Sequence, residues 1–294
     1  MIASRINIWL QATRPKTLPA AACPVLIGAA MAYDQGAIQT DVLFATFLGA
    51  LLIQIGTNFA NDYFDGIKGT DTPERVGPQR ATATGLVQPR QMLWATVLVM
   101  GAAALLGLYL TVIGGWPILV IGLLSLSSGV LYTAGPYPLG YVGLGDLFVL
   151  IFFGPVAVAG TYYLQTGACT WQVIVASLAP GLISTAILMV NNVRDRFTDK
   201  QAGKKTLVVR WGMRFGIAAY VIAILGACTT PVLLVILTRD HVYCLLGTLT
   251  LIVGVPAMRA LASDTPPEVL NQLLARTGQL LVIYSVLFSL GWVL

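Results

Sequence analysis

Charged side chains are scarce in this sequence. Asp, Glu, Lys and Arg make up only 10% of the 294 residues, whereas 57% are hydrophobic and the mean hydropathy is +0.81. This composition excludes an ordinary soluble globular protein and is typical of a protein embedded in a membrane. A helix that crosses a bilayer needs ~20 mainly apolar residues. Nine such windows occur, near 18–36, 42–62, 92–112, 116–133, 144–163, 172–193, 215–237, 241–260 and 273–293.

Paired cysteines are missing as well. The four cysteines are scattered singly with no C-x-x-C pair, which excludes a disulfide framework and a cysteine zinc site. Nothing in the sequence divides it, so we expect one transmembrane domain over 1–294. The predicted fold is all-α, a polytopic bundle of nine transmembrane helices.

Positive charge is confined to one side of this nine-helix arrangement. With the N-terminus in the cytoplasm, all 17 Lys and Arg residues except Arg239 fall on the cytoplasmic side. This is the bias expected of membrane proteins, whose cytoplasmic loops are rich in Lys and Arg. The net charge of +5 therefore favours an inward topology and an anionic substrate over nucleic acid, for which no basic aromatic surface is present.

Acidic residues are rarer still, and their placement is the most informative feature. Of only 12 Asp and Glu residues, half lie in two short stretches at the ends of apolar windows. Asn61-x-x-x-Asp65 matches Asn191-x-x-x-Asp195 at an offset of 130 residues. This match superposes the second window on the sixth and predicts a four-helix pseudo-repeat followed by a final helix.

The spacing of the polar residues predicts a metal site. Residues three or four apart share a helix face, so Asn58, Asn61, Asp62 and Asp65 can project to one side, and Asp195 and Asp199 to another. Facing carboxylates repel unless a cation lies between them, and oxygen ligands beside a phosphate suit Mg²⁺. We expect two Mg²⁺ ions bridging a diphosphate. The alternative is a set of surface ion pairs with Lys68, Arg75, Arg194 or Lys200.

Basic residues follow each acidic cluster. Lys68, Arg75 and Arg80 follow the first, and Lys200, Lys204 and Lys205 follow the second. They would bind the remaining phosphate oxygens, although the cytoplasmic bias of Lys and Arg would by itself also place bases there.

The segment 132–146 between the fourth and fifth windows contains no Lys or Arg. It holds three tyrosines and two prolines, which favours a semi-rigid lid whose aromatic rings, those of Tyr137 and Tyr141 above all, stabilise a carbocation. An interfacial belt of tyrosines is the alternative.

Together these segments resemble the UbiA superfamily of intramembrane aromatic prenyltransferases over nearly the whole chain. The stretches that carry the resemblance are 12–19, 61–71, 141–146, 191–195 and 203–207. The superfamily motif NDxxDxxxD has Gly69 at its last position, with the acid displaced to Asp71. This departure is similar to the branch that acts on 1,4-dihydroxy-2-naphthoate.

The resemblance implies a central cavity open to the membrane, with Mg²⁺ and diphosphate at a cytoplasmic mouth. The resemblance implies transfer of a polyprenyl group from polyprenyl diphosphate to 1,4-dihydroxy-2-naphthoate with loss of CO₂, giving demethylmenaquinone or its phylloquinone counterpart. It implies a bacterial inner membrane, with the active-site loops in the cytoplasm. Expected metal ligands are Asp62, Asp65, Asp195, Asp199 and Asp71. The expected catalytic residues are Lys68, Arg75, Arg80, Lys204, Tyr137 and Tyr141, and the expected cofactor-binding residues are Asn58, Asn61, Asn191, Asn192, Arg14 and Lys16.

Two other functions stay open. Another enzyme of the superfamily, acting on 4-hydroxybenzoate or homogentisate, would carry the same two clusters. An ion-coupled transporter would place acids and broken helices near the middle of the bilayer, whereas these acids lie at one edge.

Overall fold

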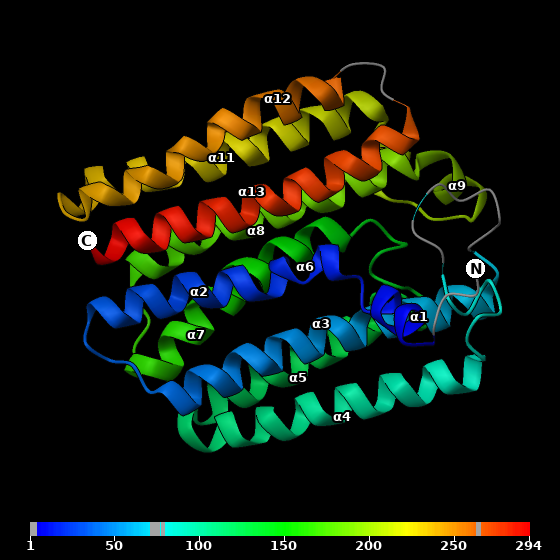
Figure 1. The fold of residues 1–294 in the computed structure, drawn as a ribbon, viewed down its shortest axis with the longest axis horizontal. Helices are drawn as coiled ribbons and strands as arrows, with labels where there is room; N and C mark the ends of the chain where they lie inside the picture. Colours follow the sequence, from blue (N-terminus) through cyan, green and yellow to red (C-terminus); the bar gives the residue numbers. More distant parts are fainter. Residues whose placement is uncertain (1–4, 71–76, 78–79, 263–265) are drawn as a thin grey trace.

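The computed structural model describes residues 5–70, 77, 80–262 and 266–294. These residues form helices joined by short connections, and no strand occurs among them, so the all-α prediction is confirmed. The long helices lie side by side in one bundle (Figure 1). In chain order the elements are α1 (Arg5–Ala12), η1 (Pro15–Thr17), α2 (Pro19–Asp34), α3 (Thr40–Lys68), α4 (Pro89–Gly114), α5 (Trp116–Leu131), α6 (Gly145–Ile151), η2 (Phe152–Val156), α7 (Ala157–Thr166), α8 (Trp171–Arg194), α9 (Arg196–Gln201), α10 (Leu207–Trp211), α11 (Met213–Thr238), η3 (Val242–Thr250), α12 (Leu251–Ala262) and α13 (Pro267–Val293).

Each of the nine apolar windows overlaps a helical segment, but the number of crossings is less definite. Within the described residues, seven helices are long and apolar enough to span a bilayer, and an eighth span results if α1–η1 and α2, bent by 51°, count as one. The remaining window is α5, which has only 16 residues. Nine crossings therefore stay a prediction, while an integral membrane protein is established.

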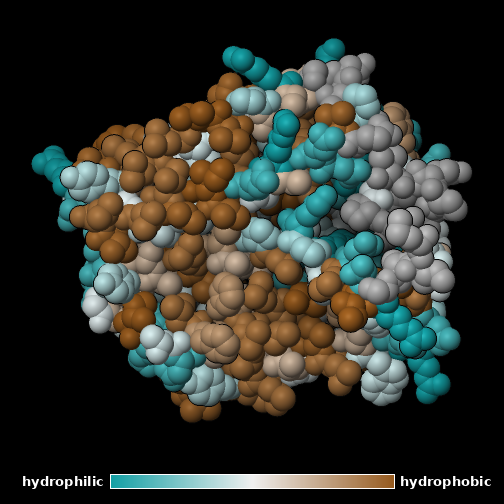
Figure 2. Space-filling model, viewed as in Figure 1, coloured by the Kyte–Doolittle hydropathy of each residue, from teal (hydrophilic) through white to brown (hydrophobic). Residues whose placement is uncertain are grey.

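The surface agrees with a lipid environment. Large apolar side chains such as Leu105, Val112, Ile222 and Ile252 are exposed on the outer helices. Figure 2 shows hydrophobic residues over most of the visible face and hydrophilic residues gathered toward the right-hand side and the edges. The right-hand side is where the N-terminus and α9 lie in Figure 1.

Helix α8 lies at the centre of the bundle. It packs against α2, α6, α11 and α13, and 67% of its most apolar stretch is buried, compared with 11% for α4. The main hydrophobic core joins these helices around Ile183, Val190 and Tyr220. The pairs α3–α4 and α8–α11 each pack closely, and the pseudo-repeat itself stays a prediction.

The span containing α6 and α7 is interrupted. Residues Phe152–Val156 form a π-helical turn, and Gly154 has non-helical backbone angles (φ −108°, ψ −107°). Pro155 lacks the N–H that would continue the helical ladder. A Cβ on Gly154 would lie 2.8 Å from the carbonyl oxygen of Ser177, so glycine permits the close crossing with α8. The interruption brings Phe152 and Phe153 to the wall of the cavity described below.

Candidate active site

A cavity of about 400 Å³ lies within the bundle, bounded by residues of α2 to α8 and of the loops at one end. Its mouth is polar and includes Asp65, Arg80, Asp195, Asp199 and Lys204. Its body is mainly apolar and reaches the opposite end of the same helices at Thr46, Leu110, Ile118 and Leu164. Because Thr46 and Asp65 are 19 residues apart on α3, the cavity extends about 28 Å along the bundle.

Asp65 is the centre of the first half of the mouth. Its side chain is buried, yet it lines the cavity. The hydroxyl of Tyr141 donates to Asp65 Oδ1 at 2.6 Å, and Arg80 Nη2 donates to Oδ2 at 3.1 Å. Lys204 Nζ lies 3.9 Å from the same Oδ2. Three residues from three different loops or helices therefore converge on this carboxylate.

Asp62 takes a different position from the one predicted. Its carboxylate accepts the backbone N–H of Ala81 at 3.0 Å and of Thr82 at 2.8 Å, and it does not line the cavity. Asp62 follows Asn61 on α3, so its side chain is rotated by about 100° from that residue, toward the loop instead of the cavity. The interaction holds the loop that carries Arg80 against α3.

The second half of the mouth is built at the end of α8. Arg194 makes two hydrogen bonds to Asp195, from Nε to Oδ1 at 2.7 Å and from Nη2 to Oδ2 at 2.6 Å. Its Nη2 also donates to Asn191 Oδ1 at 2.7 Å, and its Nη1 to Asn271 Oδ1 of α13. Asp199 follows one turn later on α9 and lies 3.7 Å from Lys204 Nζ.

Lys204 joins the two halves. Its ammonium lies within 4 Å of both Asp65 and Asp199, which come from different halves of the chain. These carboxylates therefore flank a position where a cation is favourable. Among the described residues no three acids, histidines or cysteines gather closely enough to form a ready-made metal site. The carboxylate and amide oxygens at the mouth are nevertheless the ligand types that suit Mg²⁺.

The predicted asparagines also line the mouth. Asn58 Nδ2 donates to Thr13 O at 2.9 Å and to Thr17 Oγ1 at 3.2 Å, and so ties the N-terminal segment to α3. Asn61 Oδ1 accepts the hydroxyl of Thr133 at 2.9 Å. Asn192 approaches Asp146 of α6 at 3.5 Å. Each asparagine thus fixes a neighbouring segment at the mouth.

The loop between α5 and α6 covers the mouth through Tyr141. Its ring lies beneath two ammonium groups, 4.7 Å from Lys204 Nζ and 5.1 Å from Lys68 Nζ. Its carbonyl accepts the N–H of Lys205 at 2.7 Å, and Arg210 donates to the next carbonyl, that of Val142, at 2.8 Å. The loop is therefore attached to both halves of the mouth.

Three other predicted residues are exposed, and two lie outside the described residues. Tyr137, between two prolines at the tip of the loop, is 80% exposed and outside the cavity lining. Lys68 is exposed and donates to the carbonyl of Thr133 at 2.6 Å. Arg14 lines the cavity, whereas Lys16 is exposed because the η1 turn directs Thr17 inward instead. Asp71 and Arg75 lie outside the described residues.

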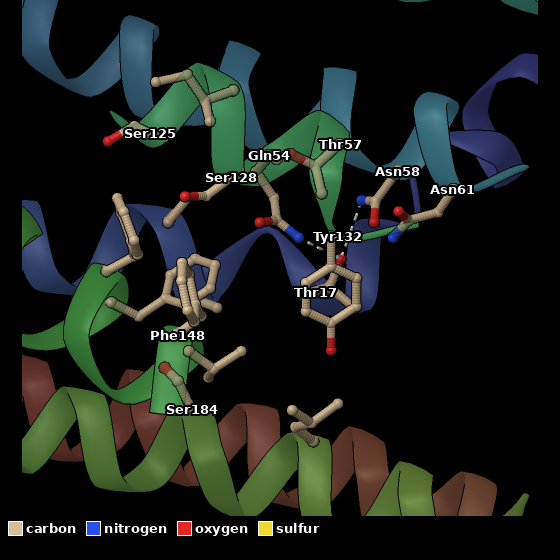
Figure 3. A pocket seen from close by; sticks show the side chains of 18 of the residues that line it. Thr17, Gln54, Thr57, Asn58, Asn61, Ser125, Ser128, Tyr132, Phe148 and Ser184 are labelled. Atoms are coloured by element: carbon tan, nitrogen blue, oxygen red, sulfur yellow. Dashed lines mark hydrogen bonds between the residues drawn. The ribbon is translucent and has the colours of Figure 1, made fainter. Parts of the chain in front are cut away.

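A polar band inside the cavity was not predicted. It comprises Gln54, Thr57, Ser125, Ser128, Tyr132 and Ser184 (Figure 3). Gln54 Nε2 donates to Thr17 Oγ1 at 3.3 Å. One signal in the sequence could have revealed part of this band. Polar residues recur at helical spacing along one face of α3, at Gln54, Asn58, Asn61 and Asp65.

The sequence is similar to those of known proteins over most of its length. Residues 21–286 match the model of the UbiA prenyltransferase family. The chain belongs to this family. It is 35% identical to a 1,4-dihydroxy-2-naphthoate octaprenyltransferase of Escherichia coli, covering 98% of this chain and 96% of that protein. It is 31% identical to a 2-carboxy-1,4-naphthoquinone phytyltransferase of Synechocystis, covering 71% of this chain and 68% of that protein.

The fold is also similar to that of solved UbiA homologues. A UbiA homologue from Archaeoglobus fulgidus, solved with GPP and Mg²⁺, superposes with a TM-score of 0.70 over 98% of this chain and 100% of that one, at 11% identity. At this identity the likeness concerns the fold alone. The family membership identifies the chain as a membrane prenyltransferase, and the cavity of this UbiA-family protein is its candidate active site.

Proposed function

We propose that this protein transfers a prenyl group from a polyprenyl diphosphate to 1,4-dihydroxy-2-naphthoate. The observation that carries the proposal is the cavity itself, whose mouth holds paired carboxylates and bases and whose body is a long, mainly apolar channel. A diphosphate fits the mouth and an isoprenoid tail fits the body. The naphthoate acceptor is favoured by the near full-length relative that acts on it.

Mg²⁺ is the proposed cofactor, because the carboxylate and amide oxygens at the mouth are ligands that suit it. Asp65, Asp195 and Asp199 would hold it, with Asn61 and Asn191 as further oxygen donors, and two ions would match the two halves of the mouth. When bound, Mg²⁺ supplies positive charge that stabilises the departing diphosphate. Asp62 supports this set by holding the Arg80 loop.

In the proposed reaction the basic residues stabilise the leaving diphosphate, and the loop that carries Tyr141 excludes water. Arg80 and Lys204 neutralise charge that grows on the diphosphate as the allylic C–O bond breaks, with its electrons going to the phosphate oxygen. The ring carbon that bears the carboxylate then bonds to the allylic carbon. The carboxylate leaves as CO₂, and its bonding electrons restore the aromatic ring, giving the prenylated 1,4-naphthohydroquinone, which is the reduced form of demethylmenaquinone or of a phylloquinone precursor. Tyr141 closes the mouth against water, which would otherwise capture the allylic cation.

We further propose that the mouth faces the cytoplasm of a bacterial cell. The mouth lies at the ends of α3 and α8 that carry most Lys and Arg residues, as cytoplasmic ends do.

The test is an acceptor assay with purified protein in lipid. Protein, Mg²⁺ and octaprenyl diphosphate are combined separately with 1,4-dihydroxy-2-naphthoate, 4-hydroxybenzoate and homogentisate, and prenylated product, diphosphate and CO₂ are quantified. Product with equimolar CO₂ from the naphthoate alone is expected. Product from 4-hydroxybenzoate or homogentisate in its place would overturn the acceptor, and CO₂-free naphthoate product would overturn the decarboxylation.

A further inference from the structure

Four glycines line the cavity at one level, far from the mouth. They are Gly49 of α3, Gly107 of α4, Gly122 of α5 and Gly160 of α7. Each lies six to nine residues from the end of its helix that is remote from the acids, or about 9 to 14 Å. The helices α4, α5 and α7 all contact α3, and the four cavity-lining glycines at this level are here called the glycine ring.

Close helix packing does not account for the glycine ring. A Cβ at Gly107, Gly122 or Gly160 would meet no atom within 4 Å, and one at Gly49 would only reach Leu106 at 4.0 Å. By contrast, a Cβ on Gly28 would lie 2.5 Å from a carbonyl oxygen of α7. Glycine weakens a helix relative to alanine, so four helical glycines that make no close contact require another reason. The space that they leave open is the cavity.

Larger side chains close the channel one turn beyond the glycine ring. Thr46, Leu110, Ile118 and Leu164 occupy the positions three or four residues farther along the same helices, and all line the cavity. Leu110, Ile118 and Leu164 belong to a separate buried cluster with Val42 and Ala45. The glycine ring therefore lengthens the channel down to this floor.

We infer that the glycine ring determines how long an isoprenoid tail the enzyme accepts at full efficiency. The inference rests on the proposed function in one respect, that the channel holds the donor tail. A side chain added at this level fills the lower channel and leaves the mouth untouched. In this inference short donors end above the ring, whereas the tail of a longer donor also occupies the space between the ring and the floor.

The experiment compares Gly107→Leu and Gly160→Leu with the parent and with the control Gly101→Leu. Gly101 is exposed on α4, does not line the cavity and also has open space at its Cβ. For each protein, kcat/KM is measured with geranyl, farnesyl, geranylgeranyl and octaprenyl diphosphate. In the channel variants we expect unchanged values for geranyl diphosphate and values for octaprenyl diphosphate lower by about 10- to 200-fold, the effect of displacing one methylene group. Gly101→Leu should match the parent throughout.

An equal loss with all donors, or no loss with octaprenyl diphosphate in either folded channel variant, would overturn the inference. If a leucine variant fails to fold, Gly107→Ala and Gly160→Ala place a smaller side chain in the channel. Binding of geranyl and octaprenyl thiolodiphosphates is measured in parallel without acceptor. A parent protein that binds both analogues but prenylates no acceptor would refute the proposed function, while the binding ratio would still decide whether the glycine ring limits the tail.

Discussion

Asp62 and Asp65 are three residues apart on one helix, yet the structure assigns them different tasks. Asp62 anchors two backbone N–H groups of the 80–85 loop, whereas Asp65 faces the cavity beside Arg80, Tyr141 and Lys204. We predict that Asp62→Asn lowers stability and leaves the Mg²⁺ dependence unchanged. Asp65→Asn should raise the Mg²⁺ concentration needed for prenyl transfer and leave the stability nearly unchanged.

The magnitudes follow from the contacts. Hydrogen bonds to a charged group contribute about 1.5–3 kcal/mol each. An amide at position 62 keeps one acceptor and turns an NH₂ group toward the other backbone N–H, so we expect a loss of about 3 kcal/mol in the free energy of unfolding. Removing the charge of Asp65 takes away one preorganised electrostatic contact, and the loss of a single oxyanion-hole donor, about 10²–10³-fold in kcat, sets the scale of the expected effect.

The assay measures two quantities for each variant in detergent, the melting temperature and the Mg²⁺ concentration for half-maximal prenyl transfer. Asp41→Asn is the matched control, because Asp41 lies at the other end of α3 and accepts a hydrogen bond from Tyr109 away from the cavity. The reasoning is refuted if Asp62→Asn raises the Mg²⁺ requirement as much as Asp65→Asn does while the melting temperature stays at the parent value.

Two further predictions concern the lid and the metal. Tyr141→Phe removes the 2.6 Å hydrogen bond to Asp65 but keeps the ring beneath the ammonium groups, so transfer should slow about tenfold and release of free prenol should rise. Tyr137→Phe, at an exposed position, should change neither rate, and equal effects of the two substitutions on prenol release would contradict the role of the lid. Chelation by EDTA should abolish transfer reversibly while leaving the melting temperature nearly unchanged, because Arg80 and Lys204 already neutralise Asp65. A large fall in melting temperature on chelation would show that the metal holds the fold.

The sequence predicted the long helices because an apolar stretch of bilayer length has few alternatives to a helix in lipid. It did not predict the bend between η1 and α2, or the π turn at Phe152–Val156, since both depend on how neighbouring helices pack. The sequence also did not predict the helices α9 and α10, because they are too short to produce an apolar window.

The sequence indicated where the polar clusters lie, but it did not indicate which side chain of each cluster faces the cavity. Asn61 and Asp65 line the mouth as their spacing indicates. The role of Asp62 depends on a loop that folds back onto α3 from nearly 20 residues away, and no local pattern records such a contact. Gln54 and Ser128 went unnoticed because single polar residues hardly alter the apolar character of a window.

Tyr141 has its backbone anchored to the loop of the second half and its hydroxyl bonded to the carboxylate of the first. A movement of this loop away from the mouth would therefore break contacts to both halves at once. If the proposed donor favours this closed arrangement, and the closed arrangement binds Mg²⁺ more tightly, then Mg²⁺ raises the affinity for the donor by the same factor. In this protein the order of binding would be a matter of concentration, because the coupling acts equally in both directions.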